Sequence, residues 1–314
     1  MGSPLRQWRF ACCPTRAACV VPPGIRPLRF IPMTTTPIVL LVLLSALMHA
    51  TWNAFLHASP DRVWQVGVMA VPQGLAAVAG IVWLPLPPVQ VWPLVLLSAG
   101  AQVAYTAALI RAYRVGEFGQ IYPIARGISP LLISGAALLL AGEWPTAMAA
   151  WGIVSICAGI LTLALRGRRF SGDSVPAALL TGVFIAAYTI VDGFGVRLSN
   201  GNGFGYLAWA YLFASVPVIG AVAKWRGGWR GMFLAPRRRV AEALGAGIVA
   251  QCAYAMVVFA LQYLPMGVVS ALRESSAIIA VLLGWLFLRE KLNARRLVAC
   301  GLVVGGAVLI KLSA

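Results

Sequence analysis

Apolar segments of about twenty residues, separated by short connections rich in Pro, Gly and Arg, follow one another along most of the chain. About 20 helical residues cross a hydrocarbon core of about 30 Å, so each segment has the length of a transmembrane helix. The predicted helices cover approximately Pro37–Leu56, Val63–Leu84, Trp92–Tyr113, Phe118–Leu140, Ala147–Leu165, Pro176–Val196, Tyr206–Ala223, Val240–Tyr263, Met266–Leu288 and Arg296–Leu312. The pattern therefore predicts an all-α polytopic membrane protein with ten transmembrane helices.

Composition excludes a soluble globular protein, because 61% of the 314 residues are hydrophobic and 11% are charged, against roughly 25% charged in soluble domains. The net charge of +17 would favour nucleic-acid binding in a soluble protein. Here long apolar runs separate the basic residues, and the chain has no basic face or aromatic RNA-binding motif. The expected partners are therefore the lipid bilayer and a small-molecule substrate, and no nucleic acid.

The basic residues predict the orientation in the membrane. Loops after odd-numbered helices hold sixteen Lys and Arg residues, whereas the other loops and the C-terminal end hold only Arg197 and Lys311. Positive loops stay in the cytoplasm, so the odd loops are expected inside and both termini outside.

Residues 1–32 form a basic, acid-free tail that Pro interrupts, with no apolar run of signal-peptide length. Since Met33 leads directly into the first helix, we interpret this tail as an over-extended start.

An internal repeat divides the chain into two halves, at residues 33–170 and 171–314. The sequence of residues 102–105 matches that of residues 251–254 at an offset of 149, and Arg126 aligns with Arg273 at an offset of 147. Glu143 aligns in the same way with Glu290, again at 147. Five helices per repeat is an odd number, so the second repeat enters from the opposite side and the pair has inverted topology. Many secondary transporters use this construction, although a duplicated scaffold without transport would also show it.

At these residues the chain resembles the drug/metabolite transporter superfamily, in particular the EamA-type permeases with two five-helix repeats. The resemblance covers about residues 37–312. It rests on Trp52-Asn53 in the first helix, Tyr105 and Tyr254 in the third and eighth, and Glu143 and Glu290 closing the fourth and ninth. The resemblance implies a ten-helix carrier of small organic molecules, commonly an exporter, that works by alternating access without ATP hydrolysis.

Polar residues within the predicted spans are the candidate site, because a charge at membrane depth costs at least about 2.5–3.5 kcal/mol and usually faces a cavity or a partner. Helical spacing places His49, Trp52 and Asn53 on one face of the first helix, and Tyr188 and Asp192 on one face of the sixth. The candidate substrate-binding residues are Trp52, Asn53, Gln102, Tyr105, Arg126, Tyr188, Asp192, Gln251, Tyr254 and Arg273. His49 and Glu274 are candidates for proton coupling.

The two arginines suggest an anionic group on the substrate. Arg126 and Arg273 occupy equivalent repeat positions, so pseudo-symmetry would bring both towards the central axis, where planar guanidinium groups clamp a carboxylate or phosphate. The structural alternatives are that Arg273 pairs with Asp192 or Glu274, and that Arg126 extends towards the membrane surface. Glu143 and Glu290 are expected to stabilise helix junctions.

Enzymatic chemistry is not expected. The sequence has no HExxH, P-loop or G-x-S-x-G motif, its two histidines fit no metal or triad motif, and its cysteines lack zinc-type spacing. The sequence therefore predicts no catalytic residue, metal or cofactor. Without a P-loop, the energy for transport must come from a gradient.

The leading hypothesis is a secondary active transporter that moves a small amphipathic or anionic metabolite, outward, by alternating access coupled to protons or exchange. One alternative is a membrane scaffold or sensor that binds lipid or a partner through the basic segment Lys224–Arg239. Another is a flippase of a lipid-linked intermediate.

Gly301 and Gly305 allow close helix packing within the chain or a homodimer. The ratio of 22 Arg to 3 Lys indicates a GC-rich bacterial genome, and hence the bacterial inner (plasma) membrane.

Overall fold

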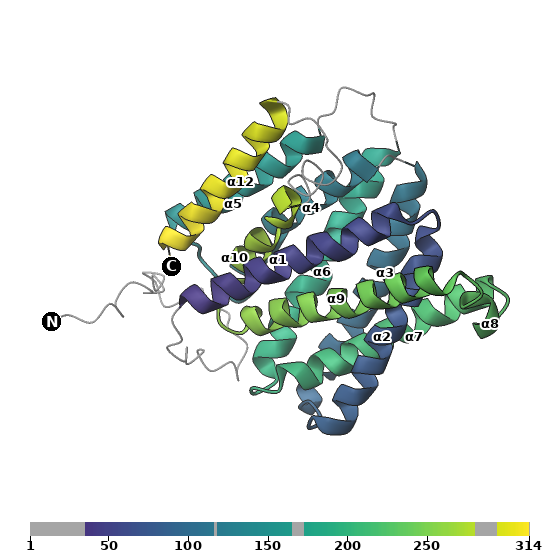
Figure 1. Cartoon of the computed structure of the whole chain (residues 1–314). Helices are drawn as coiled ribbons and strands as arrows, with labels where there is room; N and C mark the ends of the chain where they lie inside the picture. The colour runs from purple at the N-terminus through teal and green to yellow at the C-terminus, as the bar shows by residue number, and fades with distance from the viewer. Residues whose placement is uncertain (1–34, 116–117, 165–172, 280–293, 314) are drawn as a thin grey trace.

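The computed structural model describes residues 35–115, 118–164, 173–279 and 294–313, and within them it contains helices and connections but no strand. Apolar side chains and short connections make helices that run back and forth beside one another (Figure 1). The helices are α1 (Thr35–Ala58), α2 (Arg62–Trp83), the 3-10 helix η2 (Val89–Val91), α3 (Trp92–Val115), α4 (Phe118–Ala141), α5 (Ala147–Ala164), α6 (Ser174–Leu198), α7 (Gly203–Trp225), α8 (Trp229–Met232), α9 (Arg237–Leu261), α10 (Met266–Arg273) and α12 (Ala294–Ser313). The predicted tail at 1–32 lies outside the described residues.

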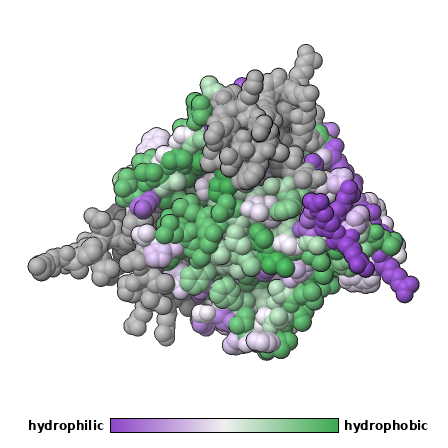
Figure 2. Space-filling view, in the orientation of Figure 1, coloured by the Kyte–Doolittle hydropathy of each residue, from purple (hydrophilic) through white to green (hydrophobic). Residues whose placement is uncertain are grey.

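Eight of the described helices are long and apolar enough to cross a membrane, and α5 is a shorter apolar helix. Large apolar side chains face outward, among them Leu139, Trp151 and Leu75, which are exposed to more than 60%. Figure 2 shows hydrophobic residues over most of the visible face, with hydrophilic residues gathered at the end that carries α8. An outward apolar surface needs lipid around it. The prediction of an all-α polytopic membrane protein is confirmed.

Contacts between helices of the two halves of the chain come in matched pairs. Helix α1 packs on α9 as α6 packs on α3, and α2 packs on α9 as α7 packs on α3 (Figure 1). Helices α2 and α7 contact each other directly, as do α5 and α12, which lie side by side. Each contact has its counterpart when α1, α2, α3 and α5 are exchanged for α6, α7, α9 and α12. This is the arrangement that a duplicated five-helix unit produces.

The ninth predicted span is interrupted. Helix α10 ends at Arg273, and the N–H of Ser275 donates to Leu272 O at 3.1 Å, an i to i−3 bond. The prediction of one unbroken helix from Met266 was therefore wrong at Glu274. The Ser275 hydroxyl donates to the same Leu272 carbonyl at 2.7 Å and so competes with the regular ladder. Residues 280–293, including Glu290, lie outside the described residues.

Close packing of α5 on α12 depends on glycines that face each other. A Cβ added at Gly152 would lie 2.7 Å from the carbonyl oxygen of Gly306, and one added at Gly306 would lie 2.6 Å from that of Gly152. Gly301 and Gly305 instead face open space, with nothing within 4 Å. Of the two alternatives for these glycines, packing against another helix of the chain is not found among the described residues, because the contact with α5 uses the other side of α12.

Candidate functional site

A cavity of about 160 Å³ lies among α1, α2, α3, α6, α7 and α9, next to the end of α10. Seven of the residues predicted for substrate binding or coupling line it: His49, Trp52, Gln102, Tyr105, Tyr188, Tyr254 and Arg273. They come from both halves of the chain, so the cavity lies where the two predicted repeats meet. This is where inverted-repeat carriers hold their substrates.

Aromatic rings form a continuous part of the wall. The ring of Tyr188 lies 5.7 Å from that of Tyr105 and 5.9 Å from that of Tyr254, and Tyr254 lies 5.8 Å from Tyr211. On the α1 side, the Trp52 ring meets His49 edge-on at 4.8 Å. Rings at these separations pack favourably while leaving their faces or edges to a ligand. The wall is therefore suited to an apolar or aromatic portion of a small molecule.

Sequence reasoning missed several residues of the wall. Gln73, Thr106, Tyr211 and Ser215 line the cavity on α2, α3 and α7. Each is a polar residue within a predicted apolar span, and this is the feature of the sequence that could have indicated them. None of them belongs to a matched repeat position.

A buried charged cluster lies beside the cavity. Nε of Arg126 lies 2.7 Å from Oε2 of Glu274, without the alignment of a hydrogen bond, and the two side chains are 5% and 0% exposed. Nε of Arg273 lies 3.9 Å from Oε1 of the same carboxylate. The sequence alternative in which Arg126 extends to the membrane surface is therefore wrong, because Glu274 draws it inward. Of the two predicted partners for Arg273, only Glu274 is in reach.

Arg273 keeps unused donors in this cluster. Its Nε and Nη2 are buried without a hydrogen-bond partner, although the residue is only 2% exposed. The cluster holds two guanidinium groups and one carboxylate, so its formal charge is +1. A buried, under-satisfied cation at a cavity wall is a site for an anion, since an unpaired buried charge is costly.

Asp192 lies behind the cavity wall and is fully buried. It accepts hydrogen bonds from the hydroxyls of Ser98, Tyr206 and Tyr254, with 2.9 Å from Tyr206. Gln102 donates to Ser98 Oγ at 3.0 Å. A cavity-lining ring and a cavity-lining amide therefore connect this carboxyl group to the cavity.

The other predicted site residues are placed less directly. Nδ2 of Asn53 donates to the carbonyl of His49 at 2.8 Å, within α1. Oε1 of Gln251 is buried without a partner, and Gln251 lies outside the cavity wall. Arg126, Asp192 and Glu274 do not line the cavity, although Asp192 and Glu274 contact residues that do.

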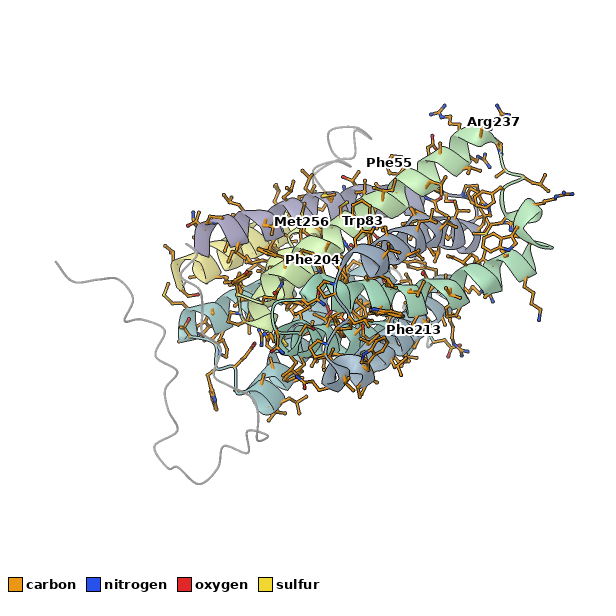
Figure 3. All side chains as sticks on the ribbon, turned by 90° about the horizontal axis from the view of Figure 1, so that it is seen from below. Phe55, Trp83, Phe204, Phe213, Arg237 and Met256 are labelled. Carbon is orange, nitrogen blue, oxygen red and sulfur yellow. The ribbon has the colours of Figure 1, made fainter. Side chains whose placement is uncertain are left out.

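A second cavity, of about 620 Å³, lies at the end of the bundle next to the basic α7–α9 connection. Its wall includes Asp61, which caps α2 through the Trp64 N–H at 2.9 Å and forms an ion pair with Arg226. Figure 3 shows Arg237 projecting away from the bundle at this end of α9. Because its charged lining is partly exposed, this cavity is a surface vestibule, distinct from the buried cluster.

The opposite end is closed by a clamp around Arg197, which pairs with Glu143. Nε of Arg197 donates to Leu261 O at 2.8 Å, and Glu143 accepts from the N–H of Met266 at 2.8 Å. The prediction that Glu143 stabilises a helix junction is confirmed. The clamp joins the ends of α4, α6 and α9 to the start of α10.

The inner cavity lies near the middle of the bundle, between the Arg197 clamp and the basic loops. Most of its lining on α2 comes from the first half of that helix and most of its lining on α7 from the second half, whereas Tyr188 and Tyr254 lie past the midpoints of α6 and α9, away from the basic loops. Both halves adjoin the end where Arg62 and Lys224 lie. Under the expected orientation, the cavity is therefore on the cytoplasmic side of the clamp.

Among the described residues, no group of three or more His, Cys, Asp or Glu side chains is placed to hold a metal ion.

Comparisons with known proteins agree with this architecture. The sequence model of the EamA-like transporter family matches residues 174–312. A solved crystal structure superposes with a TM-score of 0.70 at 18% identity, covering 88% of this chain and 99% of the other, which shows a shared fold. A search of curated proteins found no match.

Proposed function

We propose that the protein is a secondary carrier of a small amphipathic anion, because the sequence model of the EamA-like transporter family matches residues 174–312. Its substrate binds in the inner cavity between the two repeats, and alternating access moves it across the membrane. Trp52, Tyr105, Tyr188 and Tyr254 shape the cavity, and Gln102 supplies a hydrogen bond.

The observation that carries this proposal is that Arg273 has buried hydrogen-bond donors without partners at the cavity wall. It lines the cavity, is 2% exposed, and has buried donors without partners beside a cluster whose formal charge is +1. A carboxylate or phosphate oxygen would take up those donors as charge-assisted hydrogen bonds, worth about 1.5–3 kcal/mol each. Arg126 supports the site from behind by holding Glu274, which would otherwise compete fully for Arg273.

Cavity size limits the cargo. A volume of about 160 Å³ is below the roughly 300–1,000 Å³ of pockets for drug-sized ligands. The aromatic wall favours an apolar or ring-bearing portion. The proposed substrate class is therefore a small carboxylic acid with an aliphatic or aromatic side, rather than a large drug.

Alternating access follows from the two ends of the bundle. Because the Arg197–Glu143 clamp joins the helix ends on one side of the cavity, and the expected orientation places the cavity on the cytoplasmic side of this clamp, we assign this conformation to a carrier that loads from inside. Opening the clamp while closing the α2–α7 end would release the substrate outside. Export is accordingly the proposed direction when the substrate is in excess in the cell.

The test is counterflow in proteoliposomes loaded with a panel of small carboxylic acids, using the full chain. Wild-type protein should accumulate at least one labelled acid, and Arg273→Gln should raise its KM by about 10- to 100-fold, the loss of one charge-assisted bond. Arg238→Gln is the matched control, because its side chain is 90% exposed on α9. No counterflow with any member of the panel, or equal KM values for the two variants, would contradict the proposal.

A further inference from the structure

Asp192 is a buried carboxyl group without a cation. Among the described residues no Lys, Arg or His lies within 4 Å of it, and Asp192 is 0% exposed in the last third of α6. Glu274, which is equally buried, has the Arg126 guanidinium at 2.7 Å. The cost of burying the carboxyl group is therefore offset in different ways: by an ion pair for Glu274 and by hydrogen bonds from hydroxyls for Asp192.

Three of the helices packed on α6 supply the groups that contact Asp192. Helix α3 supplies Ser98, α7 supplies Tyr206, and α9 supplies Tyr254. The other ionisable groups on the helices packed against α6 include Tyr188 on α6 itself, Tyr105 and Tyr113 on α3, Tyr211 on α7, Tyr122 and Arg126 on α4, and Arg273 and Glu274 at the end of α10. Arg197, further along α6, is held by Glu143 and two backbone carbonyls. Remaining charges on α3, α7 and α9 lie at the helix ends near the basic loops.

The hydroxyls of Ser98, Tyr206 and Tyr254, called the hydroxyl cage below, can form hydrogen bonds with Asp192 in both of its protonation states. With the carboxyl ionised, Ser98 and Tyr206 donate to Oδ1, and Tyr254 donates to Oδ2. With the carboxyl protonated, the Tyr206 hydroxyl has another acceptor in reach, the carbonyl of Leu94 at 3.3 Å. A hydroxyl oxygen released in this way can accept the new proton's hydrogen bond, since hydroxyls both donate and accept.

The cage is built into the fold. A Cβ added at Gly195 would lie 2.2 Å from Cζ of Tyr206, so the missing side chain lets this ring lie against α6 and reach Asp192. All three hydroxyls donate hydrogen bonds directly to the carboxyl oxygens, so in this arrangement their protons rather than a metal cation balance the carboxylate. The cage therefore fits a proton better than a sodium ion.

Two side chains connect this carboxyl group to the cavity. Tyr254 lines the cavity and donates to Oδ2, and Gln102 lines the cavity and donates to Ser98, which donates to Oδ1. Ionised Asp192 holds the Tyr254 hydroxyl and adds a negative charge near an anion site. Protonation removes that charge and weakens the hold on the Tyr254 hydroxyl, because a neutral carboxyl oxygen is a weaker acceptor than a carboxylate oxygen.

We propose that Asp192 is the proton-binding site of the carrier, and that one proton on Asp192 accompanies each substrate anion in the same direction. This inference rests on the proposed function for its transport step, but proton binding itself does not. The carboxylate takes up a proton to become a carboxylic acid, anion affinity rises, and both ligands leave on the other side. Substrate affinity therefore falls as the pH rises through the titration of Asp192.

The transport test compares wild type with Asp192→Asn, which imitates the protonated state, in proteoliposomes. Wild type should accumulate its substrate when a pH gradient is imposed, whereas Asp192→Asn should keep counterflow and lose the response to the gradient. Asp61→Asn is the matched control, because Asp61 lies at a helix end outside the cage and should leave the response intact. Retained gradient-driven accumulation in Asp192→Asn would overturn the proposal.

The binding test needs no substrate, so it separates the proton site from the carrier function. Infrared difference spectra recorded across pH on the purified full chain should contain the C=O stretch of a protonated carboxylic acid, which disappears in Asp192→Asn and persists in Asp61→Asn. If Asp192→Asn does not fold, Tyr206→Phe and Tyr254→Phe should each shift the titration midpoint of that band. A spectrum without the band in wild type, or one unchanged by these variants, would overturn the site. A wild-type band without counterflow would leave the site standing and contradict the carrier proposal.

Discussion

Replacing Glu274 with Gln should strongly destabilise the protein. The carboxylate is 0% exposed and lies 2.7 Å from Arg126 and 3.9 Å from Arg273. Its removal leaves two buried guanidinium groups without a counter-charge, and breaking such a pair typically costs about 3–5 kcal/mol. At roughly 2–4 °C per kcal/mol for chains of this order of size, the Tm should fall by at least about 6 °C.

The chain contains its own control for this experiment. Arg238 and Glu242 form an exposed ion pair at 2.9 Å, with side chains 90% and 40% exposed. Exposed helical pairs are worth about 0.3–0.5 kcal/mol, so Glu242→Gln should leave the Tm nearly unchanged. The assay is thermal unfolding of purified variants in one detergent.

A double-variant cycle then measures the coupling. Arg126→Gln combined with Glu274→Gln should lose less stability than the sum of the single variants, because neither charge is left opposite a missing partner. Additive losses, or a Glu274→Gln variant as stable as Glu242→Gln, would refute the reasoning that the cluster is a desolvated ion pair.

Three further outcomes are expected. Gly306→Val should lower the Tm because its side chain would press on the Gly152 carbonyl, whereas Gly301→Val, which faces open space, should not. Arg197→Gln should open the end opposite the basic loops, measured as faster labelling of a cysteine placed in the cavity by a reagent added on that side; unchanged labelling would contradict the clamp. Neutralising the basic residues of Lys224–Arg239 should leave counterflow intact, and loss of flux with normal folding would favour the scaffold hypothesis.

Much of the fold could be predicted because lipid imposes a simple rule. Every backbone polar group in hydrocarbon must be satisfied within the helix, so long apolar segments become helices wherever they occur. The aligned positions of Gln102 and Gln251 predicted a duplication, which stays a prediction with which the matched contacts of α1, α2 and α3 with their counterparts are consistent. The interruption after Arg273 could not be predicted in the same way, because hydropathy does not register a local competition for the Leu272 carbonyl.

The candidate site was predicted in part. Aromatic and amide residues such as Gln102 and Tyr105 line the cavity, because helical spacing places these two on one face of α3. The partners of charged residues depend instead on how helices far apart in sequence pack. The pairing of Arg126 with Glu274 joins α4 to the end of α10, and the contact of Asp192 with Ser98 joins α6 to α3. A single sequence carries no signal for such contacts.

Charge selectivity tests the central claim most directly. The measurement is the ratio of counterflow rates for a transported carboxylic acid and its uncharged amide, which has the same shape, in wild type and in Arg273→Gln. If Arg273 holds the anionic group, wild type should prefer the acid by about tenfold or more, the value of one charge-assisted hydrogen bond, and Arg273→Gln should lose most of that preference. Equal preference in the two proteins would contradict the account, because the anion would then be held by some other group.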